Sequence, residues 1–218
     1  MDYIKNPETI EKMSFVIIDD QVKADYGGYP TENQIEKAIL RRVIHTSADF
    51  DYLDNLHISK GFIDRTLKAI KKGLTIITDT NMAYSGINKK VLEKMGCKIR
   101  CYISEDETAR YASEAGITRS MASVIRAAEE VGPKLYVFGN APTALFKTLE
   151  IYEKKDEDQE DLVGIIGVPV GFVGAAESKE ALMTSNIPSI TARGRKGGSN
   201  VAAAIVNAIL YEAEHRYG

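Results

Sequence analysis

The sequence predicts an α/β fold, a parallel sheet sandwiched between helices on both faces, with a ligand site at the carboxyl ends of the strands. Short apolar runs bounded by Gly, Asn or Pro alternate with amphipathic stretches along the chain. The runs lack polar alternation, which is typical of strands buried on both faces. Polar and glycine-rich segments follow the runs, and ligands of such folds bind where the strands end.

The expected strands cover 74–78, 98–103, 134–138, 162–170 and 189–192. The expected helices cover 33–45, 61–72, 88–95, 118–131 and 200–215, with two more running from Pro142 through Leu149 and from Ala175 to Leu182. Gly73 suits the C-terminal end of the second helix. The acidic run 153–161 is expected to be a solvated loop. No linker divides the chain, so a single domain over 1–218 is expected.

Composition excludes several classes of function. The 218 residues carry a net charge of −3, which gives no global attraction for nucleic acid. No run of 18 apolar residues occurs, so no membrane span is expected, and the N-terminus has no secretory signal. Cys97 and Cys101 are expected to be free thiols of a cytoplasmic protein. No metal-binding motif is present, so no metal site is expected.

Four loops are expected at one edge of the sheet, at 79–82, 139–142, 171–174 and 193–200. Their small and polar residues indicate one large site that a ligand approaches closely. The glycine spacing fits neither GxGxxG nor a P-loop, which argues against a standard nucleotide. The loop at 139–142 either offers helix N–H groups to an anion or carbonyl, or is a tight structural turn.

The segment from Arg193 to Asn200 carries three cations and three glycines before a helix. It suits a carboxylate or phosphate, the alternative being a solvated turn. Arg119 lies in the first turn of a helix, where a cation opposes the helix dipole, which weakly suggests a role in ligand binding. His45 lies at a helix end between arginines and hydroxyls, so it is either a catalytic acid/base or a helix-capping histidine. His57 and His215 are weaker candidates.

Seven segments together resemble the precorrin-8X methylmutase (precorrin isomerase) family, and the resemblance covers nearly the whole chain in order. They are Ile10–Phe15, Arg42–Thr46, Ile77–Met82, Thr118–Ser120, Gly139–Phe146, Gly167–Lys179 and Arg193–Ser199. One departure is Asn81, where family members often carry an acid. This position therefore supplies no carboxylate, and Asp79 is the carboxylate of its segment.

The resemblance implies an isomerase of cobalamin biosynthesis that moves a methyl group from C-11 to C-12 of precorrin-8X or cobalt-precorrin-8. It implies a homodimer that uses no cofactor, any cobalt belonging to the tetrapyrrole substrate, and a corrinoid product. The family's catalytic histidine falls on His45. The residues expected to bind the substrate are Ser14, Arg42, Thr80, Arg119, Ser120, Gly139, Asn140, Gly171, Arg193 and Gly194. A non-catalytic tetrapyrrole carrier and a nucleotide-binding α/β enzyme are the alternatives.

Overall fold

The structure is a computed structural model that describes residues 4–153 and 161–218, so most of the acidic run at 153–161 lies outside the described residues. The described part contains one six-stranded sheet with the strand order β1-β6-β5-β4-β2-β3. Its strands are β1 (Leu56–Ile58), β2 (Thr75–Thr78), β3 (Lys98–Arg100), β4 (Lys134–Phe138), β5 (Leu162–Gly167) and β6 (Ser189–Ala192). All neighbouring pairs are parallel except β1 with β6. The expected parallel sheet is confirmed, with an unforeseen antiparallel edge strand.

The helices that follow the strands also agree with expectation. The described helices are α1 (Pro7–Tyr26), α2 (Gln34–Ser47), α3 (Tyr52–Asn55), α4 (Phe62–Lys72), α5 (Asn81–Gly86), α6 (Lys89–Lys94), α7 (Asp106–Ala115), α8 (Arg119–Glu129), α9 (Pro142–Tyr152), α10 (Ala175–Thr184) and α11 (Ser199–Tyr217). The expected strand at 162–170 ends early, at Gly167. Pro169 has no backbone N–H to donate to a sheet ladder, which disfavours a longer strand.

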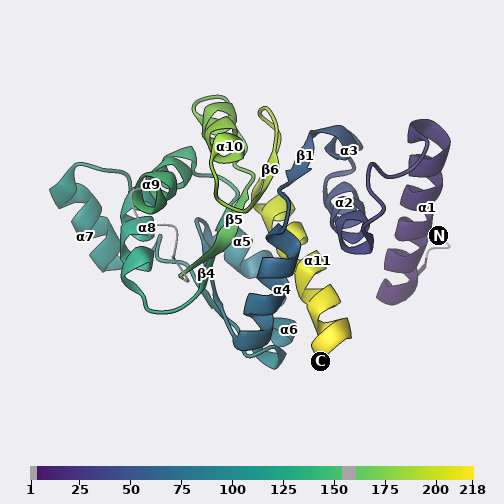
Figure 1. Cartoon of the computed structure of the whole chain (residues 1–218), viewed down its shortest axis with the longest axis horizontal. Coiled ribbons are helices and arrows are strands. Elements are labelled where there is room, and N and C mark those ends of the chain that lie inside the picture. The colour runs from purple at the N-terminus through teal and green to yellow at the C-terminus, as the bar shows by residue number, and fades with distance from the viewer. Residues whose placement is uncertain (1–3, 154–160) are drawn as a thin grey trace.

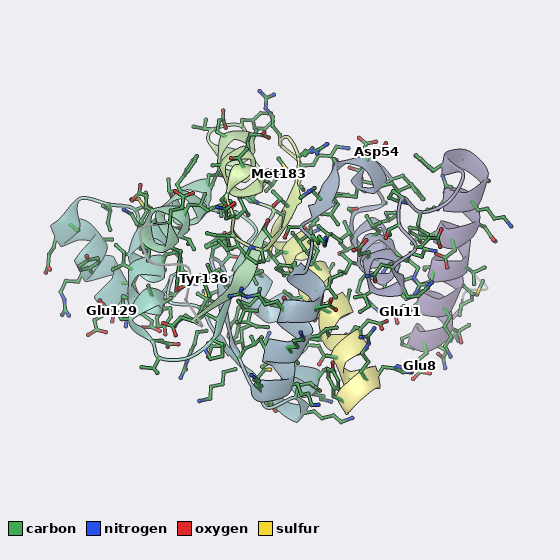
Figure 2. All side chains as sticks on the ribbon, in the orientation of Figure 1. Glu8, Glu11, Asp54, Glu129, Tyr136 and Met183 are labelled. Carbon is green, nitrogen blue, oxygen red and sulfur yellow. The ribbon has the colours of Figure 1, made fainter. Side chains whose placement is uncertain are left out.

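The side chains of β4 show how the sheet is covered on both faces. Leu135 and Val137 pack into a core with α4, α6 and α11, while Tyr136 and Phe138 pack into a second core with α8, α9 and α10. Successive strand residues point to opposite faces, so one strand feeds both cores. Figure 2 shows Tyr136 inside the molecule and Glu8 and Glu129 at its periphery. The sandwich predicted from the sequence is therefore confirmed (Figure 1).

Two N-terminal helices extend the sandwich on one side (Figure 1). Helix α2 packs against α11, and α1 packs against the outer side of α2. A separate small core joins α1 to α2 and contains Ile18, Val22, Leu40 and Ile44. Helix α1 was not expected, because its apolar residues are divided between this core and an exposed face that carries Ile10, Met13 and Ile17. Among the described residues, no helix meets the length and apolarity that a bilayer span requires.

Candidate active site

The four loops expected at one edge lie there together. The strands β6, β5, β4 and β2 are consecutive neighbours and run parallel, so the segments after them leave the sheet on the same side (Figure 1). These segments begin at Asp79, Gly139, Val168 and Arg193. They lead into the helices α5, α9, α10 and α11, respectively. One continuous ligand site can form from these loops.

Asp79 holds the loop after β4 in place. Its buried carboxylate accepts hydrogen bonds from the backbone N–H groups of Gly139 at 3.0 Å, Asn140 at 2.7 Å and Ala141 at 2.7 Å. Burial raises the pKa of Asp79, and the same three N–H donors act in the opposite direction. Asp79 lies in the segment 79–82 that was expected at the site, but it was not among the residues expected to bind the substrate. An acid placed directly after a buried strand is the sequence feature that could have indicated its role.

Gly139 allows the start of α11 to approach β4. A Cβ atom on Gly139 would lie 2.5 Å from the Cα atom of Ser199, closer than any side chain permits. The hydroxyls of Thr80 and Ser199 form a hydrogen bond of 2.8 Å, which joins the loop after β2 to the same point. These contacts support the tight-turn interpretation of Gly139 itself, while Asn140 next to it is exposed.

Three helices begin at this edge without a side-chain cap. The residues that precede α9, α10 and α11 are Ala141, Gly174 and Gly198, and none of them caps its helix through a side chain. Asn or Thr side chains cap α1, α2, α5, α6 and α8, whereas α3, α4 and α7 also begin without such a cap. First-turn N–H groups without a side-chain partner attract anions, and the helix dipole adds to this. The edge is therefore suited to carboxylates even though the chain is slightly acidic.

The loop from Arg193 to Gly198 covers the end of β5. The N–H of Gly171 donates to the Arg195 carbonyl at 3.2 Å, and the N–H of Gly198 donates to the Val168 carbonyl at 2.9 Å. Gly194 has a φ of 71°, a left-handed conformation that favours glycine.

The three cations of this loop are placed differently. Arg193 and Arg195 are exposed, and neither forms an ion pair with a described residue, although the Arg195 guanidinium lies over the Phe172 ring at 5.3 Å. Lys196 instead forms ion pairs with Asp49 at 2.6 Å and Asp51 at 2.5 Å. Arg193 and Arg195 are therefore the cations of this loop that are available to a ligand.

His45 faces a cavity of about 260 Å³ at the end of α2. The imidazole is exposed and lies edge-on to the Phe15 ring, with centroids 5.3 Å apart. The wall contains Thr46 and the start of α11, together with Arg42 and Glu11, which form an ion pair of 2.9 Å. Figure 2 shows Glu11 on the side of α1 that faces α2. The cavity thus offers a histidine, a cation and an anion close to the strand-end loops.

Ser14 and Arg42 have partners within the protein. The Ser14 hydroxyl donates to the carbonyl of Ile10, one turn back in α1. The Arg42 guanidinium lies over the rings of Phe15 and Tyr211, at 5.2 Å and 4.7 Å. A ligand carboxylate at Arg42 would have to compete with Glu11.

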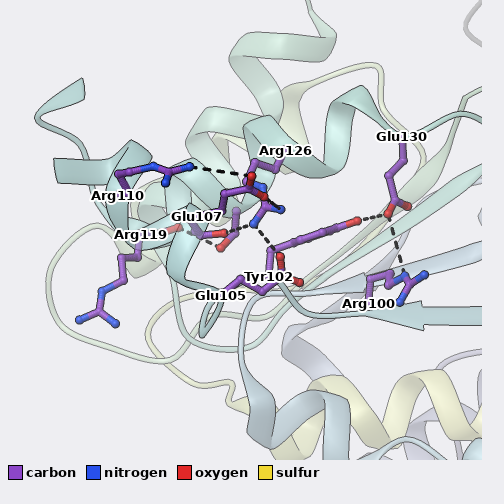
Figure 3. Close-up of polar contacts among 10 residues, drawn as sticks. Arg100, Tyr102, Glu105, Glu107, Arg110, Arg119, Arg126 and Glu130 are labelled. Atoms are coloured by element: carbon purple, nitrogen blue, oxygen red, sulfur yellow. Dashed lines mark hydrogen bonds and ion pairs between the residues drawn. The ribbon is translucent and has the colours of Figure 1, made fainter. Parts of the chain in front are cut away.

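Arg119 and Ser120 lie farther along the same edge, at the start of α8. The hydroxyls of Thr118 and Thr143 are 3.2 Å apart, which places this helix start beside the start of α9. Figure 3 shows the guanidinium of Arg119 pointing away from the neighbouring ion-pair cluster, and this side chain is exposed. The structure therefore brings most of the expected residues to one edge, with Arg119 and Ser120 at its far end.

A larger cavity, of about 670 Å³, lies between α7 and α8 and contains none of the expected residues. Its wall is an ion-pair network in which Arg126 binds Glu105 and Glu107, while Tyr102 and Arg100 contact Glu130 (Figure 3). The wall carries five carboxylates against three guanidinium groups and contains no histidine, so it disfavours an anionic ligand. The cavity beside His45 is therefore the better candidate for chemistry despite its smaller volume.

The weaker histidines stay outside the site. His57 lies in β1, where it pairs with Thr191, and His215 is exposed near the end of α11. Both cysteines are free. In the described part of the chain, no three or more His, Cys, Asp or Glu side chains are grouped as a metal site would require.

Comparisons with known proteins identify relatives over almost the whole chain. The family model of precorrin-8X methylmutase matches residues 9–212. The cobalt-precorrin-8 methylmutase of Salmonella typhimurium is 53% identical over 212 residues, which cover 97% of this chain and 98% of that protein. The precorrin-8X methylmutase of Pseudomonas aeruginosa is 37% identical over 216 residues, covering 98% and 100%. The structure of precorrin-8X methylmutase from Thermus thermophilus matches with a TM-score of 0.84 and 31% identity, covering 95% and 98%.

Proposed function

The chain belongs to the precorrin-8X methylmutase family, and from this premise we propose that it is the isomerase of cobalamin biosynthesis that moves a methyl group from C-11 to C-12 of precorrin-8X or cobalt-precorrin-8. The product is hydrogenobyrinate or cobyrinate. The observation that carries the proposal is the family match over residues 9–212, which includes the segments that form the strand-end edge.

His45 acts as the acid of this reaction. The imidazole is exposed at a cavity, and an imidazole can both donate a proton and take it back. Donation of the proton to a ring nitrogen or a nearby atom draws electrons away from C-11 and C-12 and favours migration. The methyl group leaves C-11 as it bonds to C-12, and the proton returns to His45, so the reaction consumes no co-reactant. Such general acid catalysis contributes about 10²–10⁴-fold.

The strand-end edge binds the carboxylates of the macrocycle. The substrate is wide, flat and carries many acetate and propionate groups. Arg193, Arg195 and Arg119 are exposed cations along the edge, and the uncapped starts of α9, α10 and α11 add N–H donors. Glycines such as Gly171 and Gly194 let the ring approach the backbone. Binding in the conformer that suits the product supplies the rest of the acceleration.

We further propose that the enzyme is a homodimer whose site is completed by the second subunit. The cavity at His45, about 260 Å³, is smaller than the roughly 300–1,000 Å³ of a typical small-molecule pocket, so it holds only part of a macrocycle. Phe172 and Val173 beside the edge are 81% and 90% exposed, and α1 exposes Ile10, Met13 and Ile17 on one face. A mass of one chain by light scattering at micromolar concentration would contradict the dimer.

The cofactor and location of the enzyme follow the same premise. The rearrangement is intramolecular, so we propose that it needs no cofactor and that any cobalt belongs to the substrate. A cytoplasmic location agrees with the two free cysteines.

A spectral assay tests the function. Purified protein is incubated separately with metal-free precorrin-8 and with cobalt-precorrin-8, and the visible spectrum is followed. Appearance of the corrinoid product from either substrate is expected, and the faster substrate identifies the natural one. Tight binding without conversion of either substrate would contradict the isomerase and indicate a tetrapyrrole carrier.

A further inference from the structure

A buried lysine lies directly behind the strand-end edge. Lys179, in the second turn of α10, is 0% exposed, and its Nζ atom donates to the backbone carbonyl of Lys196 at 2.7 Å. No described carboxylate lies within ion-pair distance of it. Burial lowers the pKa of Lys179 to about 8.

An ammonium group in this environment is costly. Burial removes its water shell, and a single carbonyl oxygen compensates only part of that loss. An apolar side chain of similar length would fill the same space without this cost. Among the described residues, the Lys196 carbonyl is the one hydrogen-bond partner of Lys179 Nζ, so any role of the ammonium acts through this bond.

The carbonyl that Lys179 binds belongs to a residue with a second attachment. The Lys196 ammonium binds the carboxylates of Asp49 and Asp51. These carboxylates lie in the turn that ends α2, and the N–H of Asp51 donates to Asp49 Oδ1 at 3.0 Å. His45 is four residues before Asp49 in this same helix end. The backbone and side chain of Lys196 therefore connect α10 to the chain segment that carries His45.

The loop between these attachments also has a close contact with β5. Gly197 has a φ of 157°, and a Cβ atom there would lie 2.1 Å from the Val168 carbonyl oxygen. The loop thus rests with bare backbone on the end of the strand, while Arg193 and Arg195 extend to solvent from its other part. Backbone hydrogen bonds also hold the loop at Arg193, Arg195 and Gly198. The attachments at Lys196 add side-chain contacts to both α10 and the turn after α2.

We infer that Lys179 is a positioning residue for the methyl transfer: by holding the Lys196 carbonyl, it fixes the substrate-binding loop 193–198 and, through the ion pairs of Lys196, the turn after His45. The inference rests on the proposed function. Lys179 is too deeply buried to touch the macrocycle, so it acts through Lys196. We name this connection the Lys179–Lys196 link.

The first test is Lys179→Met, which keeps the length and apolar stem but removes the donor. We expect the affinity for cobyrinic acid, followed by its visible spectrum, to fall about tenfold, as loss of a charged hydrogen bond predicts. The KM for precorrin-8 should rise in parallel, with a smaller fall in kcat. Backbone amides at 49–51 and 193–198 should exchange hydrogen faster in the unliganded variant. If Lys179 served stability alone, the unfolding free energy would change and the affinity and KM would not.

The second test is a double-mutant cycle with Lys196→Met. Only the connection to the turn 49–51 runs through both lysines. Lys179→Met combined with Lys196→Met should therefore lower the protection of the amides at 49–51 against hydrogen exchange no further than the stronger single variant. Lys37→Met is the matched control, because it removes a surface ion pair with Glu32 at the opposite end of α2. Its effect should be small and additive with that of Lys179→Met.

Three results would overturn the inference: wild-type affinity and KM in Lys179→Met, additive losses of protection in the cycle, or unchanged exchange at 49–51. If Lys179→Met does not fold, Lys196→Met tests the link instead, because this variant keeps the buried ammonium of Lys179. Wild-type affinity and wild-type exchange at 49–51 in that variant would also overturn the link. Failure of the wild-type protein to bind cobyrinic acid would contradict the proposed function, and hydrogen exchange in the unliganded protein would still test the link.

Discussion

The ring of Phe15 lies edge-on to the imidazole of His45, with the centroids 5.3 Å apart and the planes 72° to one another. The contact joins α1 to the end of α2, and Phe15 also lies under the guanidinium groups of Arg41 and Arg42, at 4.7 Å and 5.2 Å. Phe15 therefore limits the orientations that His45 can adopt beside the cavity. The unforeseen first helix is in this way part of the support of the proposed acid.

Phe15→Leu should lower kcat several-fold, because His45 loses its aromatic neighbour and samples other rotamers. The free energy of unfolding should fall by about 0.5–1.5 kcal/mol, the usual contribution of an aromatic pair. Steady-state kinetics and urea unfolding measure the two effects. Tyr26→Leu is the matched control. Tyr26 lies on α1 like Phe15, and its ring stacks on that of Phe50, which is outside this helix. A normal kcat in Phe15→Leu would show that the contact does not orient His45.

His45→Ala should reduce the isomerisation rate by roughly two to four decades and leave product binding largely intact. The reason is that the substitution removes the proton donor without disturbing the cations of the strand-end loops. Single-turnover kinetics and a spectral titration with cobyrinic acid separate the two effects. His215→Ala, at an exposed site near the C-terminus, is the control. Conversion by His45→Ala at the native rate would mean that catalysis rests on binding geometry alone.

Arg193→Ala and Arg195→Ala should each weaken binding of cobyrinic acid by about 1–3 kcal/mol, because a partly desolvated carboxylate loses a charged donor. Titration at two ionic strengths measures the loss. Lys72→Ala removes an exposed cation at the end of α4 and should have no effect on affinity. Unchanged affinity in both arginine variants would assign the loop to the solvated-turn interpretation.

Asp79→Asn should lower the free energy of unfolding by about 1–3 kcal/mol, because an amide NH₂ group would then face a backbone N–H donor of the loop 139–141. The displaced start of α9 should also raise KM. Chemical denaturation and kinetics measure both. Asp20→Asn, on the exposed side of α1, should change stability by no more than about 0.5 kcal/mol. Native stability in Asp79→Asn would argue that the carboxyl is not needed as an anion.

The buried Lys179 should make stability depend on pH. The pKa of Lys179 is about 8 in the folded chain, whereas the ordinary pKa of a lysine is 10.5. Between these two pH values the unfolded chain therefore binds more protons than the folded chain. The free energy of unfolding should therefore rise with pH from about 8 to 10.5. The difference between wild type and Lys179→Met, measured by urea unfolding across this range, should follow that rise. A difference that stays constant with pH would contradict an ammonium buried at this position.

Local patterns were enough for most of the elements and for their arrangement around one edge, although β1, α1 and α3 were not expected. The apolar runs at β2, β4 and β6 and the amphipathic spacing of α2 and α4 were read close to their observed bounds. A Gly or polar segment after each buried run located the strand-end loops, since parallel strands end on the same side. Helix α1 was missed because its apolar residues serve two faces, which weakens the helical period.

The partners of charged groups could be decided only in three dimensions. Arg193, Arg195 and Lys196 are equivalent cations in the sequence. Among the described residues, however, only Lys196 forms ion pairs, and its carboxylate partners lie about 150 positions earlier in the chain. Lys179 looks like any helix lysine in the sequence, and only the folded structure shows that it is buried and bound to the Lys196 carbonyl. The sequence by itself determined the fold class, the family and the position of His45, because these depend on residues near one another in the chain. Tertiary structure decided which charges remain free for a ligand, because that depends on contacts between distant segments and on the removal of water around them.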